Sequence, residues 1–107
     1  EKAARWWVGM DPVEAGELLY NKRGCNQCHS IDGAGGIGPT FKGSFGARRG
    51  LVTGDAVTMD ENYIRESILN PRAKIVAGFD PVMPTFQGRF KDEELQVMIA
   101  YIKSLSE

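Results

Sequence analysis

Histidine and cysteine are scarce in this 107-residue chain, which contains one histidine and two cysteines. A structural zinc site takes four Cys or His ligands, so these counts exclude one. No apolar run approaches the roughly 18 residues that would indicate a transmembrane helix, and no signal peptide is visible. The net charge of -1 argues against nucleic acid or an anionic membrane surface as the main partner. It also predicts only modest electrostatic steering of a partner protein.

The sequence also lacks any strand pattern of appreciable length and any internal repeat. A redox-active dithiol normally opens a helix within alternating strands and helices, and no such pattern flanks the two cysteines. We expect one small domain at residues 11–107, after a linker or N-terminal extension at residues 1–10 that contains Trp6 and Trp7. The core of such a short chain is marginal, and a buried cofactor would supply the missing apolar interior.

The five residues Cys25-Asn26-Gln27-Cys28-His29 carry the clearest chemical signal. Two thiols separated by two residues and followed by a histidine are the pattern for covalent attachment of a c-type haem. One turn of backbone presents both sulfurs to the two vinyl groups of one porphyrin, and His29 then becomes an axial ligand of the iron. The sequence therefore predicts one covalent haem c, attached outside the reducing cytosol.

A helix is predicted before this motif. Asp11 is its expected N-cap, and Pro12 occupies the first turn, where the missing N–H is not needed. The helix is expected to run to about Arg23 and to end at Gly24.

Two further helices are predicted, at about 60–69 and 92–105, with a brief helical turn at 71–75. Together with the first helix they give an all-α fold of about three to five helices. The long segments between the helices are expected to wrap around the cofactor.

Residues 30–54 hold most of the glycines and show neither a helical nor a strand period, which predicts a long loop. Phe41 and Phe45 are expected to pack on a face of the porphyrin. Arg48 and Arg49 are candidates for pairing with the haem propionates, because a guanidinium binds a carboxylate in a bidentate fork. The sequence does not choose between the two arginines, and both also fit a solvated charge pair.

The sixth iron ligand must come from elsewhere in the chain, and the four methionines compete for this role. Met98 falls on the apolar stripe of the last helix, where methionine ordinarily fills the core, and Met10 lies too close to the first helix. Met83 lies in an irregular segment between prolines, a backbone that can aim a thioether with little entropy left to lose. We predict Met83, with Met59 as the alternative. A His/Met pair gives a higher reduction potential than a pair of histidines would, and it suits reversible electron transfer.

Two further residues are predicted to act around the haem. The ring nitrogen of His29 that does not bind iron is expected to donate to a backbone carbonyl, and Pro39 is the candidate acceptor. Tyr63 is expected on the inner side of the second helix, in contact with the haem.

These residues resemble the class I cytochrome c family across nearly the whole chain. The resemblance implies a small cytochrome c fold in which the first and last helices cross near Gly16, Tyr20, Met98 and Tyr101. It also implies an electron carrier rather than an enzyme. The matching features are Gly16 and Tyr20, the haem motif, Gly38-Pro39, Phe45-Gly46, Asn70-Pro71, Met83-Pro84 and the closing Ile99-Ala100-Tyr101-Ile102.

Residues 63–71 and 78–88 are more narrowly similar to the cytochrome c domain fused to subunit II of caa-type cytochrome c oxidases. This likeness implies that a membrane-anchored copper-binding domain precedes Glu1. The haem would then accept an electron from a soluble donor protein and pass it to the copper centre. The site of action would be the periplasmic or extracytoplasmic face of the cytoplasmic membrane, with the membrane contacted only through the parent subunit.

Three functions are therefore compared. The expected one is an electron-transfer domain of a terminal oxidase, with no chemistry of its own. The alternative is a free periplasmic mono-haem cytochrome c that serves another reductase or dehydrogenase. The third is a haem sensor or enzyme whose sixth position opens to bind a small ligand, which carbon monoxide binding to the ferrous protein would reveal.

Overall fold

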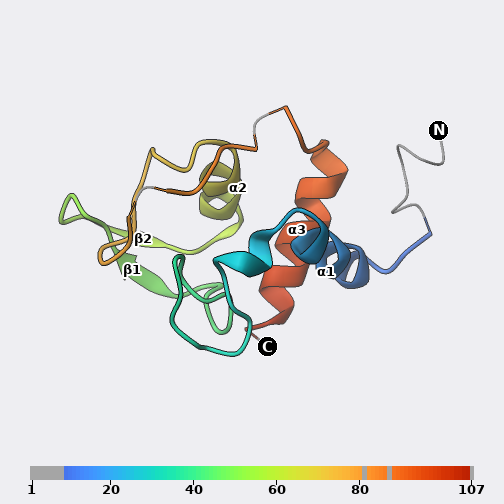
Figure 1. Cartoon of the computed structure of the whole chain (residues 1–107), viewed down its shortest axis with the longest axis horizontal. Helices are drawn as coiled ribbons and strands as arrows, with labels where there is room; N and C mark the ends of the chain where they lie inside the picture. Colours follow the sequence, from blue (N-terminus) through green and yellow to red (C-terminus); the bar gives the residue numbers. More distant parts are fainter. Residues whose placement is uncertain (1–8, 81, 87, 107) are drawn as a thin grey trace.

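The computed structural model describes residues 9–80, 82–86 and 88–106 (Figure 1). The expected linker at residues 1–10, with Trp6 and Trp7, lies almost entirely outside the described residues, and its boundary stays a prediction. None of the helices in these ranges is both long and apolar enough to cross a membrane. In chain order, the elements are α1 (Pro12–Lys22), the 3-10 helix η1 (Cys25–Gln27), β1 (Arg48–Gly50), β2 (Ala56–Thr58), α2 (Glu61–Leu69) and α3 (Asp92–Ser104).

The ends of α1 follow from its capping residues. The Asp11 carboxylate accepts the backbone N–H groups of Val13 and Glu14 at 3.1 and 3.2 Å, two of the donors that lack a partner at a helix start. Gly24 follows the helix end with φ of 80°, a left-handed conformation that glycine adopts without strain. The chain therefore leaves α1 at the expected point and turns directly into η1.

The starts of α2 and α3 also match the sequence expectation. The Asp60 carboxylate caps α2 by accepting the Tyr63 N–H at 2.8 Å. The Glu94 carboxylate in the first turn of α3 accepts the Lys91 N–H at 2.8 Å, and Arg23 lies 4.0 Å from the same carboxylate. Glu94 is buried, so this carboxylate links the start of α3 to the end of α1.

Helices α1 and α3 cross one another (Figure 1), and Gly16 lies at their contact. A Cβ at Gly16 would lie 2.1 Å from the Val97 carbonyl oxygen and 2.6 Å from Tyr101 Cβ, so only glycine permits this approach. The rings of Tyr20 and Tyr101 pack beside the crossing with centroids 5.5 Å apart. The expected crossing is found with Gly16 and Tyr20 against Tyr101, and the closest backbone contact of Gly16 is with Val97. Met98 is 1% exposed and faces the interior.

Two local expectations were wrong. Residues 48–58 contain an antiparallel pair, β1 and β2, where no strand was predicted. Each strand has three residues, which is too short for the alternation of side chains to show in a sequence. Residues 71–75 form a turn rather than a helix, with the Ala73 N–H donating to the Asn70 carbonyl at 3.1 Å. The chain leaves this turn to join the strand pair.

Residues 71–80 and 82–86 follow α2 and lead toward α3. We call these residues the strap. Its first part lies against β1: the Val52 N–H donates to the Ile75 carbonyl at 2.8 Å, and the Ala77 N–H donates to the Gly50 carbonyl at 2.9 Å. These bonds attach the strap to the strand pair. The strap, η1, α2, α3 and β1 thereby surround one region of the interior.

Candidate functional site

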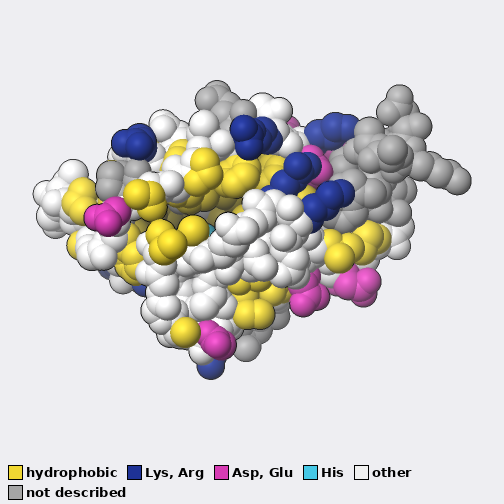
Figure 2. Space-filling model, viewed as in Figure 1, with side chains coloured by type: hydrophobic (Ala, Val, Ile, Leu, Met, Phe, Trp, Pro, Cys, Tyr) yellow, Lys and Arg dark blue, Asp and Glu magenta, His cyan; other side chains and the backbone are white. Residues whose placement is uncertain are grey.

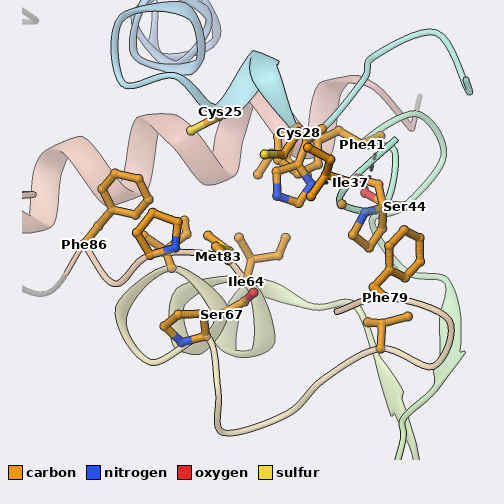
Figure 3. A pocket seen from close by; sticks show the side chains of 18 of the residues that line it. Cys25, Cys28, Ile37, Phe41, Ser44, Ile64, Ser67, Phe79, Met83 and Phe86 are labelled. Atoms are coloured by element: carbon orange, nitrogen blue, oxygen red, sulfur yellow. Dashed lines mark hydrogen bonds between the residues drawn. The ribbon is translucent and has the colours of Figure 1, made fainter. Parts of the chain in front are cut away.

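A cavity of about 490 Å³ lies in this region, lined mainly by apolar side chains from η1, α2, α3 and the strap. Figure 3 shows Cys25 and Cys28 on one wall. Met83, Ile64 and Ser67 lie on the wall across from them. The volume falls within the roughly 300–1,000 Å³ that small-molecule and cofactor sites occupy.

The 3-10 helix η1 explains how both thiols reach the cavity. Residues three apart eclipse one another in a 3-10 turn, so Cys25 and Cys28 face the same side. The Cys28 N–H donates to the Cys25 carbonyl at 3.2 Å, and the His29 N–H donates to the same carbonyl at 2.9 Å. Both cysteines are free thiols and half-buried, and burial raises the pKa of the Cys25 thiol. The wall therefore presents two sulfurs available for covalent attachment.

His29 lines the cavity in a fixed orientation. Its Nδ1 lies 2.7 Å from the Pro39 carbonyl oxygen, which can only accept, so Nδ1 carries the proton and Nε2 keeps its lone pair. The ring stacks on Phe41 with centroids 4.5 Å apart. A Cβ at Gly38 would lie 2.6 Å from the imidazole, so glycine is required there. Burial lowers the pKa of His29, against the opposing effect of the Pro39 hydrogen bond, and favours the neutral form that binds metals.

Three of the four methionines line the cavity. Met59 is 6% exposed, and both its backbone groups are hydrogen-bonded beside the strand pair, to Gly46 and Ala47. Met98 belongs to the core face of α3. Met83 is half-buried on the strap and lies across the cavity from the cysteines (Figure 3).

The strap is also tied after Met83. The Thr85 hydroxyl donates to the Leu69 carbonyl at 2.7 Å, and the Phe86 N–H donates to the Ile68 carbonyl at 3.1 Å. Both acceptors belong to the end of α2. Because the strap is fixed to β1 before Met83 and to α2 after it, the thioether is held within a segment of limited freedom.

The two neighbouring arginines have different surroundings. Arg49 lines the cavity, and its Nε is buried without a hydrogen-bond partner among the described residues. Arg48 is exposed and donates to the Thr58 hydroxyl at 3.3 Å. Successive side chains of a strand point to opposite faces, so β1 can direct only one of the pair inward. An unpaired buried guanidinium N–H is unfavourable, which indicates an absent acceptor.

Among the predicted aromatic contacts, Phe41 and Tyr63 line the cavity, whereas Phe45 does not. The Phe45 N–H donates to the Ser106 hydroxyl at 3.0 Å, and Lys103 Nζ lies 5.4 Å from its ring centroid. The turn after Phe41 therefore carries Phe45 to the end of α3, outside the cavity lining where it was expected.

Tyr63 and Ser67 form a polar pair on the cavity side of α2. Their side chains share a hydrogen bond, and burial raises the pKa of Tyr63, against the lowering effect of that bond. Ser67 was not singled out from the sequence as a site residue, although it lies one helical turn after Tyr63 on the same face. Phe79 and Phe86 were missed as well, because the segments around them have no periodicity to place their side chains.

The exposed residues that line the cavity form its mouth. Ile37 and Val82 are each 58% exposed there. Figure 2 shows hydrophobic side chains in a hollow, with Lys and Arg side chains along its edge. The charged residues of the mouth are the basic Lys22, Arg23, Arg72 and Lys74 and the acidic Asp80.

Comparison with known proteins identifies the family. The family model for cytochrome c matches residues 13–106, nearly the whole chain. The chain belongs to the class I cytochrome c family. This cytochrome c is 33% identical to cytochrome c-550 of Nitrobacter winogradskyi over 84% of its length and 87% of the relative's. It is 30% identical to cytochrome c2 iso-1 of Magnetospirillum fulvum, over 76% of this chain and 90% of the relative. It is 32% identical to cytochrome c2 of Blastochloris viridis, over 86% of this chain and 76% of the relative.

Membership of the family brings one covalent haem c and the role of an electron carrier that is not itself an enzyme. The site fits this group on independent grounds. Two thiols and a neutral imidazole face one cavity of suitable volume, and a buried guanidinium lacks an acceptor that a propionate could provide. The expected all-α cytochrome c fold is confirmed, apart from the short strand pair.

Proposed function

We propose that this cytochrome c carries single electrons on a haem held by thioether bonds to Cys25 and Cys28, with His29 and Met83 as the axial ligands of the iron. The observation that carries the proposal is the placement of both thiols and the fixed His29 ring at one cavity, with Met83 on the wall across from the thiols. When bound, the haem supplies a reversible one-electron iron couple.

The chain's own residues favour electron transfer over ligand binding. Pro39 fixes the tautomer of His29, so the imidazole meets the iron through Nε2 without reorganisation. The ties of the strap on both sides of Met83 favour a sixth position that stays filled. We therefore expect a six-coordinate low-spin spectrum in both oxidation states. Carbon monoxide binding to the ferrous protein at neutral pH would instead support the haem sensor or enzyme.

Met83 and Met59 can be distinguished by paired substitutions. In the holoprotein, Met83→Ala should abolish the red-region absorption band that arises from sulfur-to-iron charge transfer, whereas Met59→Ala should keep it, because Met59 is held by the strand pair. Wild-type protein produced by a host competent in haem attachment should also keep its pigment on acid-acetone extraction. A band that survives Met83→Ala and disappears in Met59→Ala would reverse the ligand assignment. Loss of the pigment on extraction would refute covalent attachment.

Around the haem, we assign Arg49 to a propionate and Phe41 and Tyr63 to the porphyrin edge and faces. The buried, unpartnered Nε of Arg49 supports the first assignment. The position of Phe41 and Tyr63 in the cavity wall supports the second. Arg48 and Phe45 take no part in this proposal.

For the biological setting, we favour a free periplasmic carrier that serves another reductase or dehydrogenase. The relatives found are named cytochrome c2 and cytochrome c-550, and they match over most of their own lengths. Thioether formation requires thiols delivered outside the reducing cytosol, which supports the periplasmic side. The partners would be redox proteins that meet the cavity mouth in a small, transient contact.

The second candidate is the cytochrome c domain of oxidase subunit II, which passes its electron to a copper centre. The similarity of residues 63–71 and 78–88 to such domains favours it. The coding sequence upstream of Glu1 decides between the two candidates. A copper-ligand motif there would establish the oxidase, and its absence from the complete gene would leave the free carrier.

A further inference from the structure

Tyr20 reaches the haem motif from α1. Its hydroxyl donates to the backbone carbonyl of His29, and its side chain is almost wholly buried. Its ring also lies 5.7 Å from the Phe41 ring, which in turn stacks on the His29 imidazole. Tyr20 therefore supports His29 in two ways: its hydroxyl binds the backbone carbonyl, and its ring packs on Phe41, which stacks on the imidazole.

The bonds to the neighbouring carbonyls show why this contact is distinctive. The Gly38 N–H donates to the Cys28 carbonyl at 2.9 Å, and the Phe41 N–H donates to the Ser30 carbonyl at 2.8 Å. Both of these donors come from the same loop. Among the described residues, the hydrogen bond to the His29 carbonyl between them comes from the side chain of Tyr20, which belongs to a different element.

We propose that Tyr20 is a positioning residue for the iron-binding imidazole. Its hydroxyl ties the His29 peptide to the crossing of α1 and α3, which is fixed by the contact of Gly16 with Val97. His29 is then held at three points: its backbone carbonyl by Tyr20, its ring Nδ1 by Pro39 and its ring face by Phe41. This inference rests on the proposed function, in which His29 is an axial ligand.

The competing explanation is that Tyr20 only fills the core. A phenylalanine would fill the same space, since the ring contacts with Phe41 and Tyr101 need no hydroxyl. The substitution Tyr20→Phe therefore separates the two explanations. Tyr101→Phe is the matched control: Tyr101 is 4% exposed in the same aromatic cluster, and its hydroxyl makes no hydrogen bond within the described residues.

The test compares wild type, Tyr20→Phe and Tyr101→Phe as ferric holoproteins by NMR. In Tyr20→Phe the His29 carbonyl loses its hydrogen-bond donor. Loss of a typical hydrogen bond lowers the free energy of local opening, so that opening becomes about fivefold more frequent. We expect the hyperfine-shifted resonances of the axial histidine to move in Tyr20→Phe. Exchange of the His29 Nδ1 proton with solvent should become about fivefold faster. Tyr101→Phe should leave both readouts unchanged.

The outcomes separate the inference from the function beneath it. If the axial-histidine resonances shifted from their wild-type positions equally in both variants, or in neither, the positioning role would be overturned and the proposed function would stay intact. A wild-type spectrum without axial-histidine resonances would overturn both. Urea unfolding of each holoprotein monitors global stability, so equal losses of stability with unequal histidine shifts would support positioning rather than packing.

Discussion

Adjacent residues of the same type can have opposite roles, as Arg48 and Arg49 illustrate. The alternation of side chains along β1 directs Arg49 into the cavity and Arg48 to solvent. The sequence identified both arginines as candidates but could not choose, since a three-residue strand leaves no readable alternation. The haem motif was predictable because it has a fixed spacing, and the contact between His29 and Pro39 was predictable because a metal-binding histidine ordinarily donates its other ring N–H to a carbonyl.

The assignment of Arg49 predicts a change in reduction potential. Replacing Arg49 by Met removes a positive charge near the haem, which favours the ferric state, so the potential should fall by roughly 20–60 mV. Arg48→Met should leave the potential within experimental error of the wild type, because that side chain is solvated. Redox titration of the two holoproteins at one ionic strength measures both. Equal shifts would contradict the assignment of the propionate contact to Arg49.

At the scale of elements, the ends of the helices could be predicted from their capping residues, and the helix crossing from one glycine. Asp11, Asp60 and Gly24 mark helix ends where local chemistry alone determines them. The strand pair and the strap were not predictable in this way. Their structure depends on hydrogen bonds between segments distant in sequence, such as Val52 to Ile75, which no local pattern records.

The helix crossing gives a stability prediction. Gly16→Ala places a methyl group 2.1 Å from the Val97 carbonyl oxygen, so α1 and α3 must move apart. Overpacking of this kind should lower the free energy of unfolding by about 1–3 kcal/mol or more. Gly35→Ala is the control, because a Cβ there meets no atom within 4 Å and Gly35 has no positive φ. Urea unfolding of the holoproteins checks both. A Gly16→Ala protein as stable as Gly35→Ala would show that the crossing tolerates separation.

At the scale of the whole molecule, the haem completes a core that the chain leaves open. The radius of gyration is 13.5 Å, close to the roughly 13 Å of an ordinary 100-residue domain, yet the interior contains a cavity of about 490 Å³. The cofactor and the general fold were predictable because the motif and the family resemblance specify them. The distribution of charge was not, since a net charge of -1 conceals a mouth with four basic residues and one acidic residue.

Because basic residues predominate at the mouth, we expect electrostatic steering there, although the net charge predicted only modest steering. Arg23 lies near the buried Glu94, and Lys74 pairs with Glu66 at 2.6 Å, so the positive potential at the mouth is partly offset. Arg72 forms no ion pair within the described residues, and within a Debye length of about 10 Å at 0.1 M salt its charge should still attract an anionic reagent. We therefore expect oxidation by hexacyanoferrate(III) to be faster at low salt and to slow as salt is added.

Charge reversal at the mouth should remove this attraction. Arg72→Glu should slow oxidation by hexacyanoferrate(III) about two- to fivefold at low salt and speed oxidation by the cationic tris(phenanthroline)cobalt(III). Arg48→Glu makes the same change in net charge on an exposed residue outside the cavity lining, so it should change both rates less. Stopped-flow rates over a salt series provide the measurement. Equal effects of the two reversals would mean that the net charge, and not the mouth, governs the encounter.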